Sequence, residues 1–384
     1  MSGRVVLAMS GGVDSSVAAY LLKQQGYEVI GLFMRTGVHA PDDDTPVHKK
    51  GCCSAQDACD ARRVADRLDI PFYALDFEKD FDGVIDYFAD EYVAGRTPNP
   101  CVVCNTWLKF GKLWFYGKQL GADFVATGHY ARLMVGENGI ELHRAVDPDK
   151  DQSYVLFGLR TSLLRHLLFP IGGYRKEEVR ELARRAGLSV FDKPDSVEIC
   201  FVPGGDHAEL IRQRRPELAT AGKIVDTDGH VLAEHDGIEQ FTIGQRKGLG
   251  FAAGERRYVL RIVPDENTVV VGRREELLAR GLVASRVNWL FDGPPLTSIT
   301  CAAKIRYRHQ AAPALVRPLS DGGARVDFDE PQSAITPGQA VVFYDGDRVL
   351  GGGWIEHAIR DEASGLVDSQ AGFTAPQPSQ SMSQ

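Results

Sequence analysis

Ser10-Gly11-Gly12-Val13-Asp14-Ser15-Ser16 is the stretch that most strongly predicts the fold of this 384-residue chain. It follows an apolar run, Arg4–Met9, that is typical of a buried strand, and it leads into Ser16–Gln25, whose apolar residues recur at helical spacing. A glycine then ends the predicted helix, and Val29–Phe33 has the composition of the next strand. The stretch is therefore the first turn of a strand–helix–strand unit, in which helices cover parallel strands.

The composition of this turn favours an anionic ligand. Its two glycines let the backbone approach a ligand closely, its serines add hydroxyl donors, and the N-terminus of the following helix attracts negative charge. The turn matches neither G-x-x-x-x-G-K-[ST] nor G-x-G-x-x-G, so neither a Walker A loop nor a dinucleotide fingerprint is predicted. We expect it to hold the phosphate chain of a nucleotide.

The pattern of the sequence changes near residue 206. Before it, helices are expected over 57–68, 108–120 and 174–186, and strands over 72–75 and 124–126, which together predict a parallel α/β sheet. Short β-like runs separated by Gly and Asp follow, and the last of them predict a β-barrel. We expect an N-terminal α/β domain at 1–206, a small β-rich central domain at 207–280, a C-terminal β-barrel at 281–360 and a disordered tail at 361–384.

The composition excludes several classes of protein. With 43% hydrophobic residues the chain can fill two or three cores, which excludes a disordered protein. Its net charge of −8 excludes a protein that coats nucleic acid through bulk charge, although 240–261 and 281–320 each carry five basic residues against one acidic residue. No apolar run reaches the ~20 residues that span a bilayer, and no leader is evident, so a cytoplasmic protein without membrane contact is expected. Seven cysteines favour reduced thiols over a disulfide scaffold.

Cys101 and Cys104 stand in unusual surroundings. They follow Asn99-Pro100, which forces an extended or turning backbone, and a helix is expected just after Cys104. A helix N-terminus would lower the pKa of this thiol, so a thiolate nucleophile and a buried structural cysteine both remain open. No second Cys-x-x-Cys or Cys-x-x-His follows at finger-like spacing, which disfavours structural zinc.

The sequence SGGVDSS after a first strand resembles the PP-loop motif of the ATP pyrophosphatase superfamily. Its members cleave ATP between the α and β phosphates and adenylate a substrate oxygen. The resemblance implies ATP and Mg²⁺ as ligands, AMP and diphosphate as products, and Asp14 close to the phosphates. The ATP-binding residues that it implies are Ala8, Met9, Ser10, Gly11, Gly12, Val13, Asp14, Ser15, Met34 and Gly128.

Further motifs make the resemblance more specific. In chain order they are Gly31–Met34, Gly95–Pro100 with Cys104-Asn105, Ala126–Tyr130, Lys150–Tyr154, Glu198–Phe201, Gly244–Gly250 and Thr336–Gln339. Together with the first loop they closely resemble the bacterial tRNA-specific 2-thiouridylases over nearly the whole chain. The family implies a tRNA-uridine 2-sulfurtransferase that places sulfur on C2 of the wobble uridine in the tRNAs for lysine, glutamate and glutamine.

The resemblance also implies roles for three cysteines. Cys200 would carry a persulfide received from a cysteine desulfurase or a sulfur-relay protein, Cys104 would be the catalytic nucleophile, and each turnover would leave a disulfide between them. Many members have Asp where this chain has Cys101, which leaves the role of Cys101 open. A second interpretation places an iron–sulfur cluster on Cys101, Cys104 and Cys200, because three thiolates are a plausible ligand set. Apart from the Mg²⁺ that accompanies ATP, no other metal site is predicted.

The implied RNA contacts lie in several segments. A base in an anticodon loop must turn out of its stack to reach such a site. His129 alone would be interpreted as a structural histidine, and only its motif favours RNA, whereas Lys304–Arg308 is expected to be an alternating strand that projects charge to one side. The residues implied to contact tRNA or its target base are Asn99, Pro100, Cys101, His129, Lys150, Asp151, Gln152, Arg306, Tyr307 and Gln339.

Two other functions would fit part of the sequence. Another PP-loop enzyme, an adenylating ligase or amidotransferase synthetase, would act on a small carboxylate or carbonyl and would not need Cys104 or Cys200. A non-enzymatic RNA-binding protein would bind tRNA without releasing diphosphate. The intact first loop and the two distal cysteines favour the sulfurtransferase over both.

Overall fold

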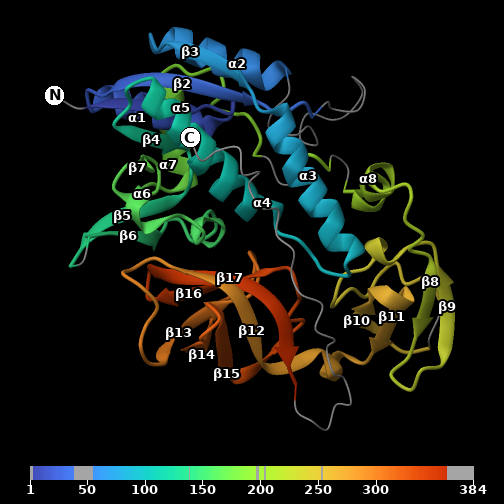
Figure 1. The fold of residues 1–384 in the computed structure, drawn as a ribbon. Coiled ribbons are helices and arrows are strands. Elements are labelled where there is room, and N and C mark those ends of the chain that lie inside the picture. The colour runs from blue at the N-terminus through green and yellow to red at the C-terminus, as the bar shows by residue number, and fades with distance from the viewer. Residues whose placement is uncertain are drawn as a thin grey trace.

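The chain folds into three parts, which Figure 1 shows as an α/β part in blue to green, a small β part in yellow and a barrel in orange to red. The computed structural model describes residues 3–38, 55–137, 139–195, 199–202, 205–251 and 254–360. The predicted disordered tail at 361–384 lies outside these ranges. Within them, no helix combines the length and the apolar character needed to cross a membrane.

A five-stranded parallel sheet forms the centre of the α/β part. Its strand order is β3-β2-β1-β4-β7, and all neighbouring strands run parallel. The predicted α/β fold is therefore confirmed. The strands are β1 (Arg4–Ala8), β2 (Glu28–Arg35), β3 (Phe72–Asp76), β4 (Phe124–Thr127) and β7 (Leu167–Leu168).

Helices cover both faces of this sheet, which is why its strands are nearly continuous apolar runs. Val5 and Leu7 of β1 point to one face and pack in a core with α1, α2 and α7. Val6, between them, points to the other face and packs with η2 and α5. These helices are α1 (Val13–Gln24), α2 (Ala55–Arg67), α7 (Lys176–Arg185), the π-helix η2 (Cys104–Lys112) and α5 (Leu113–Gln119).

Two helices begin earlier than the sequence predicted. The first starts at Val13 instead of Ser16, which places Asp14 and Ser15 in its first turn. The helix predicted over 108–120 starts at Pro100 as α4 (Pro100–Val103) and continues through η2 and α5. Asn99 caps it by accepting a hydrogen bond from the Val102 N–H (3.4 Å), and proline suits the first helical turn. Cys104 therefore lies inside a continuous helix, and the prediction of a helix start just after this thiol is wrong.

A long helix that the sequence did not predict, α3 (Glu78–Val93), connects the α/β part with the small β part (Figure 1). Its buried face includes Phe81, Val84 and Phe88. Near its other end, the Tyr92 ring stacks on the His207 ring of α8 (His207–Arg214) with centroids 4.6 Å apart. The helix thus fixes the small β part beside the α/β sheet.

The small β part is a four-stranded sheet in the order β10-β11-β8-β9. Strand β11 pairs with β8 in parallel, and the other pairs are antiparallel. The strands are β8 (Gly222–Val225), β9 (Val231–His235), β10 (Tyr258–Val263) and β11 (Thr268–Gly272). The predicted β-rich character of this part is confirmed.

The last part is a closed antiparallel barrel, as predicted. Its strands follow the order β12-β15-β14-β13-β16-β17, and β12 pairs with β17 to close it. The hairpin of β5 and β6, which belongs to the α/β part, joins the barrel sheet through β17. The strands are β5 (Ala131–Gly136), β6 (Gly139–Arg144), β12 (Leu278–Trp289), β13 (Ile299–Lys304), β14 (Ala312–Pro318), β15 (Ala324–Ser333), β16 (Ala340–Asp345) and β17 (Arg348–Ile359), and the short helix α6 (Thr161–Leu164) lies between the hairpin and β7 in the chain.

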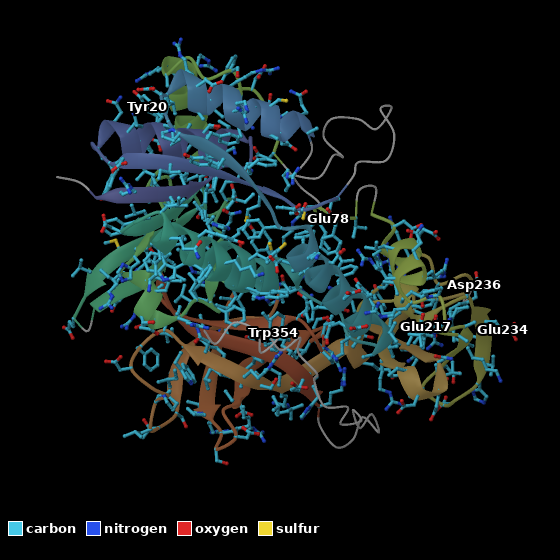
Figure 2. The ribbon with its side chains drawn as sticks, turned by 45° about the horizontal axis from the view of Figure 1, so that its top comes forward. Tyr20, Glu78, Glu217, Glu234, Asp236 and Trp354 are labelled. Carbon is cyan, nitrogen blue, oxygen red and sulfur yellow. The ribbon has the colours of Figure 1, made fainter. Side chains whose placement is uncertain are left out.

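The barrel packs directly on the α/β part. The Trp354 ring of β17 lies 6.2 Å from the Tyr87 ring of α3 and 6.1 Å from the Phe157 ring, measured between centroids. Figure 2 shows Trp354 where the barrel faces the α/β part. The two parts therefore share an apolar interface.

Candidate active site

The predicted nucleotide loop joins β1 to α1. The Met9 N–H donates to the Leu32 carbonyl (2.8 Å), which holds the end of β1 beside β2. The Ser15 hydroxyl accepts a hydrogen bond from the Ser10 N–H (3.2 Å) and lies 3.3 Å from the Ser10 hydroxyl. The N-cap residue is Gly12, whose lack of a side chain leaves the N-terminus of α1 open to an anion.

Two glycines bring other segments against this loop. Gly11 has a φ of +75°, and a Cβ there would lie 2.2 Å from the carbonyl oxygen of Asp57 in α2. Gly128 follows β4, and a Cβ there would lie 2.7 Å from the backbone nitrogen of Ser15. The structure therefore brings the predicted residues 8–15 and Gly128 together at the carboxyl ends of β1 and β4, where open α/β sheets bind ligands.

Charged and polar side chains that the sequence did not single out surround Asp14. Lys176 Nζ donates to both Asp14 oxygens (2.8 and 2.9 Å), and the Tyr130 hydroxyl donates to Oδ1 (2.8 Å). Lys176 also lies 2.8 Å from Asp195, whose other oxygen pairs with the predicted residue Lys150 at 2.9 Å. Although burial opposes it, Lys176 and Lys150 lower the pKa of Asp195. No pattern could identify Lys176, because 162 residues separate it from Asp14.

Lys193 supports the loop from its other side. Its ammonium donates to the Gly11 carbonyl (3.0 Å) and to the carboxylates of Asp57 (2.7 Å) and Asp60 (2.6 Å) in α2. Although burial opposes it, these two carboxylates raise the pKa of Lys193. The loop is thus fastened to α2 through one half-buried cation, a contact that a lone lysine in the sequence does not reveal.

Cys104 and Cys200 contact the same apolar cluster. That cluster includes the buried rings of Phe77, Phe81 and Phe88, and both cysteines pack against it half-buried. The predicted residue Met34, near the end of β2, packs against it as well. The structure therefore brings the two thiols into one region with a predicted ATP residue.

Cys101 is exposed, and it lies in α4 three residues before Cys104. Burial raises the pKa of Tyr307, and the nearby Asp151 and Cys101 raise it further. Tyr307, Asp151 and Cys101, which were all predicted to contact tRNA, are therefore neighbours. Arg306 and Tyr307 lie in the turn after β13, which ends at Lys304, so the predicted strand over 304–308 is wrong. The Lys304 ammonium instead sits 5.7 Å from the centroid of the Tyr307 ring.

The segment before Cys101 is held by the barrel. Gln339 Nε2 donates to the carbonyls of Thr97 (3.0 Å) and Pro98 (2.9 Å), and the Thr97 N–H donates to the Pro337 carbonyl (2.9 Å). Gln339 was predicted to contact tRNA, and its amide here fixes the loop that leads into Asn99 and Pro100.

Asp151 and Gln152, two further predicted RNA contacts, bond to the backbone. The buried Asp151 carboxylate accepts from the N–H groups of Ala145 (3.2 Å) and Ser153 (3.1 Å). Gln152 Oε1 accepts from the Tyr130 N–H (2.9 Å). Both side chains therefore shape the segment around Asp14 and Tyr307.

His129 is buried between the Phe110 and Phe169 rings, with centroids 5.8 and 6.1 Å away. Its Nδ1 lies 2.7 Å from the Thr127 hydroxyl. Burial, assisted by the Lys109 charge, holds the pKa of His129 well below its usual 6.5. The imidazole is therefore neutral at pH 7.

This burial predicts a pH dependence of stability. Because the unfolded chain binds a proton on His129 near pH 6.5 and the folded chain does not, acidification below pH 6.5 favours unfolding. We expect this residue to reduce the free energy of unfolding by up to about 1.4 kcal/mol per pH unit. Urea titrations of wild type and His129→Gln at pH 5–7 would show a flatter profile for the variant. If the free energy of unfolding changed equally with pH in both proteins, His129 would not be the residue responsible, since the other histidines are common to both.

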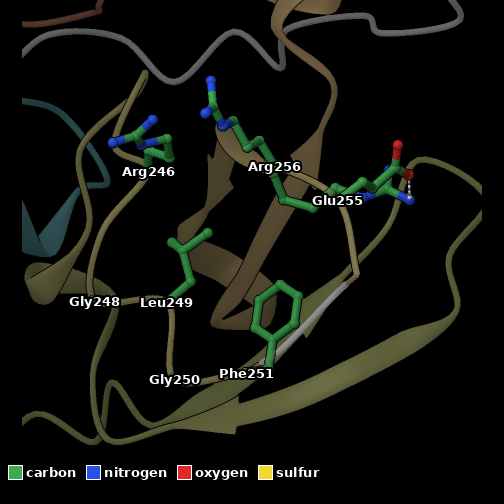
Figure 3. A pocket seen from close by; sticks show the side chains of 8 residues that line it. Arg246, Gly248, Leu249, Gly250, Phe251, Glu255 and Arg256 are labelled. Carbon is green, nitrogen blue, oxygen red and sulfur yellow. Dashed lines mark ion pairs between the residues drawn. The ribbon is translucent and has the colours of Figure 1, made fainter.

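A basic pocket of about 710 Å³ lies in the small β part, within the segment whose sequence showed excess positive charge. Figure 3 shows Arg246 and Arg256 at its rim, Leu249 and Phe251 below them, and a dashed line at the Glu255 carboxylate, which forms an ion pair with Arg257. That ion pair measures 2.6 Å. The pocket concentrates guanidinium groups on a chain of negative net charge.

The parallel sheet, the Gly-rich turn after its first strand and the polar residues gathered at that turn define a nucleotide-using α/β protein of the PP-loop class. Three domain-family models match the chain: "tRNA methyl transferase HUP domain" at residues 3–204, "tRNA methyl transferase PRC-barrel domain" at 209–273 and "Aminomethyltransferase beta-barrel domain" at 279–355. These three matches follow the three parts of the fold.

Relatives match over nearly the full chain. The tRNA-specific 2-thiouridylase MnmA of Rhodopirellula baltica is 51% identical over 394 residues, covering 94% of this chain and 98% of the relative. Those of Geotalea uraniireducens (50%, covering 94% and 97%) and Clostridium acetobutylicum (48%, covering 93% and 100%) are similar. The chain belongs to the family of tRNA-specific 2-thiouridylases.

Proposed function

We propose that this protein is a cytoplasmic tRNA-uridine 2-sulfurtransferase that uses ATP to place sulfur on C2 of the wobble uridine, at position 34. Its substrates are the tRNAs for lysine, glutamate and glutamine, and its sulfur comes from a cysteine desulfurase or a relay protein. The observation that carries the proposal is the packing of Cys104 and Cys200 against one apolar cluster, together with Met34. A ligase that adenylates a small substrate has no use for this pair of thiols.

The first step is activation of the uridine. The C2 oxygen forms a bond to the α phosphorus of ATP, the bond from that phosphorus to the bridging oxygen breaks, and diphosphate leaves with the electron pair. The N-terminus of α1 and the Ser10 and Ser15 hydroxyls supply donors to the phosphates. The Asp14 carboxylate is a hard oxygen ligand that would suit Mg²⁺, and the ion would neutralise phosphate charge there.

The second step transfers sulfur. In one route the Cys104 thiolate attacks the Cys200 sulfur of the persulfide, and the hydrosulfide that leaves attacks C2 and expels AMP. In the other route the persulfide attacks C2, AMP leaves, and Cys104 then attacks the Cys200 sulfur to release the thiolated base. Both routes end in a disulfide between Cys104 and Cys200, which a cytosolic dithiol must reduce.

RNA binding is proposed for the face between the α/β part and the barrel. The flipped base would meet Asn99, Pro100 and Cys101, and Gln339 of the barrel holds the two residues before them, Thr97 and Pro98, through their carbonyls. Arg306, in the turn after β13, supplies positive charge on the barrel side, Lys150 supplies it beside Asp195, and the basic pocket around Arg246 adds more. The proposed domain boundaries at 206, 280 and 360 assign tRNA binding mainly to the barrel.

Single-turnover thiolation under anaerobic conditions tests this function. The assay uses unmodified glutamate tRNA, ATP, a cysteine desulfurase with cysteine, and the variants Cys101→Ser, Cys104→Ser and Cys200→Ser. Cys59→Ser is the matched control, because this thiol is exposed on α2, outside the apolar cluster. We expect Cys104→Ser and Cys200→Ser to lose at least about 100-fold in rate, because each removes a covalent participant. Cys101→Ser and the control should retain activity.

Iron content measured on the same samples separates the alternatives. Stoichiometric iron that is lost with any of the three cysteines would replace the persulfide route with an iron–sulfur mechanism on Cys101, Cys104 and Cys200. Diphosphate release without thiolation would indicate an adenylating enzyme of another kind. Binding of tRNA without diphosphate release would indicate a non-enzymatic RNA-binding protein.

A further inference from the structure

Lys176 is a buried cation at the centre of the nucleotide site, and no motif in the sequence accounts for it. It opens α7, its side chain is only 10% exposed, and its ammonium lies 2.8 Å from both Asp14 Oδ1 and Asp195 Oδ1. It also lies 5.7 Å from the centroid of the Tyr130 ring. Burying a long flexible cation costs desolvation free energy and side-chain entropy, so a position this enclosed needs strong partners.

Lys176 belongs to a network of charged side chains beside the nucleotide turn. The carboxylates of Asp14 and Asp195 contact three cations, which are Lys176, Lys150 and Arg180. A third carboxylate, Asp147, accepts a hydrogen bond from the Lys176 backbone N–H (2.9 Å), so the three cations and three carboxylates balance. The N-terminus of α1, where Asp14 lies, adds the partial positive charge that favours an anion.

Among these cations, the partners of Lys176 differ from those of the other two. Lys150 and Arg180 pair with Asp195, and Arg180 also donates to the Phe191 and Lys193 carbonyls, which orders the loop after α7. Lys176 donates to both oxygens of Asp14, which lies in the turn predicted to face the phosphates. The ammonium therefore lies beside the turn that is expected to hold the phosphates.

We propose that Lys176 is a diphosphate-binding residue of this site, an inference that rests on the proposed ATP-dependent function. Asp14 holds the ammonium in place in the absence of nucleotide, and the ammonium turns to the β phosphate when ATP enters. When the bond to the α phosphorus breaks, the departing diphosphate gains negative charge. Lys176 stays protonated and stabilises that charge by donating hydrogen bonds. Asp14 then becomes available for Mg²⁺.

Equilibrium binding of inorganic diphosphate, measured by calorimetry with Mg²⁺ and again with EDTA, tests this inference without turnover. Lys176→Met keeps the aliphatic length and removes the charge, and we expect it to weaken diphosphate binding by about 10- to 100-fold, the loss of a charge-assisted hydrogen bond. Lys176→Arg should recover part of the affinity, because it retains the charge with a different geometry. Arg185→Met, on the exposed side of the same helix, is the matched control and should bind as wild type does.

The outcomes are distinct. Diphosphate binding by Lys176→Met within about twofold of wild type would overturn the inference, since a purely structural lysine predicts that result. If Lys176→Met does not fold, as judged by circular dichroism, Lys176→Gln replaces it and is expected to show the same weakening. A wild-type protein that binds diphosphate but thiolates no tRNA would refute the proposed function and leave the role of Lys176 to be decided by the same binding data.

Discussion

Gly11→Ala is expected to reduce ATP-dependent diphosphate release at least about 100-fold and to lower the free energy of unfolding by about 2–4 kcal/mol. The φ of +75° disfavours any residue with a Cβ, and that Cβ would lie 2.2 Å from the Asp57 carbonyl oxygen. Because α2 supplies this oxygen, the turn would have to move away from α2 and from Lys193. The phosphate donors of the turn would then be misplaced.

Gly12→Ala is the matched control for the stability measurement. Gly12 has an extended backbone with φ −91°, and a Cβ there would approach only the Ser10 hydroxyl, at 3.7 Å. We expect its cost to be less than about 1 kcal/mol, the usual price of alanine at an N-cap. Urea unfolding of both variants, followed by circular dichroism, measures the difference. A Gly11→Ala protein as stable as Gly12→Ala would show that the turn adapts and that the close approach does not constrain it.

Glu91→Ala is expected to lower the free energy of unfolding by about 3–5 kcal/mol, because it leaves the Arg96 guanidinium without its buried carboxylate. Arg96 Nε and Nη2 donate to the two Glu91 oxygens at 2.9 and 2.6 Å, and the side chains are 9% and 1% exposed. Arg96 directly precedes Thr97 and Pro98, so the loop that leads to Cys101 would lose its anchor on α3. Thiolation should fall together with stability.

The double variant Glu91→Leu/Arg96→Met distinguishes the two effects. Burial raises the pKa of Glu91 even though Arg96 opposes this shift. The cost of burying the two charges therefore offsets much of the attraction between them. Replacing both partners by apolar side chains should therefore recover most of the lost stability. Thiolation should stay low, because apolar side chains do not fix the direction of the loop. Recovery of both properties would show that the pair has no positioning role.

The parts of the fold that depend on local sequence patterns could be predicted from the sequence. The strand, Gly-rich turn and helix around Ser10–Ser16 predicted the parallel sheet and the loop, because periodicity and glycine placement act over a few residues. The family resemblance was confirmed by relatives of about 50% identity over most of the chain. Its motifs also located Cys104 and Cys200, which the fold brings to one cluster.

Contacts between distant segments were not predictable in the same way. Lys176, Lys193 and Asp195 reach the nucleotide turn from the other end of the α/β part, and single charged residues carry no periodic signal. The early start of the helix at Pro100 depends on the Asn99 cap, whereas the search for apolar periodicity placed the helix eight residues later. The roles of the site residues in ATP and tRNA binding stay predictions.

The hydrogen bonds from Gln339 to Thr97 and Pro98 also set an order of events during protein synthesis. The donor follows its two acceptors by 242 and 241 residues in the chain. At ribosomal rates of about 5–20 residues per second, roughly 10–50 s pass between the emergence of the loop and that of its partner. Before Gln339 emerges, the residues that hold the nucleotide turn, Gly128, Lys176 and Lys193, have already been made, whereas the backbone before Cys101 still lacks the glutamine that fixes it. The enzyme is thus completed only when its final strands leave the ribosome.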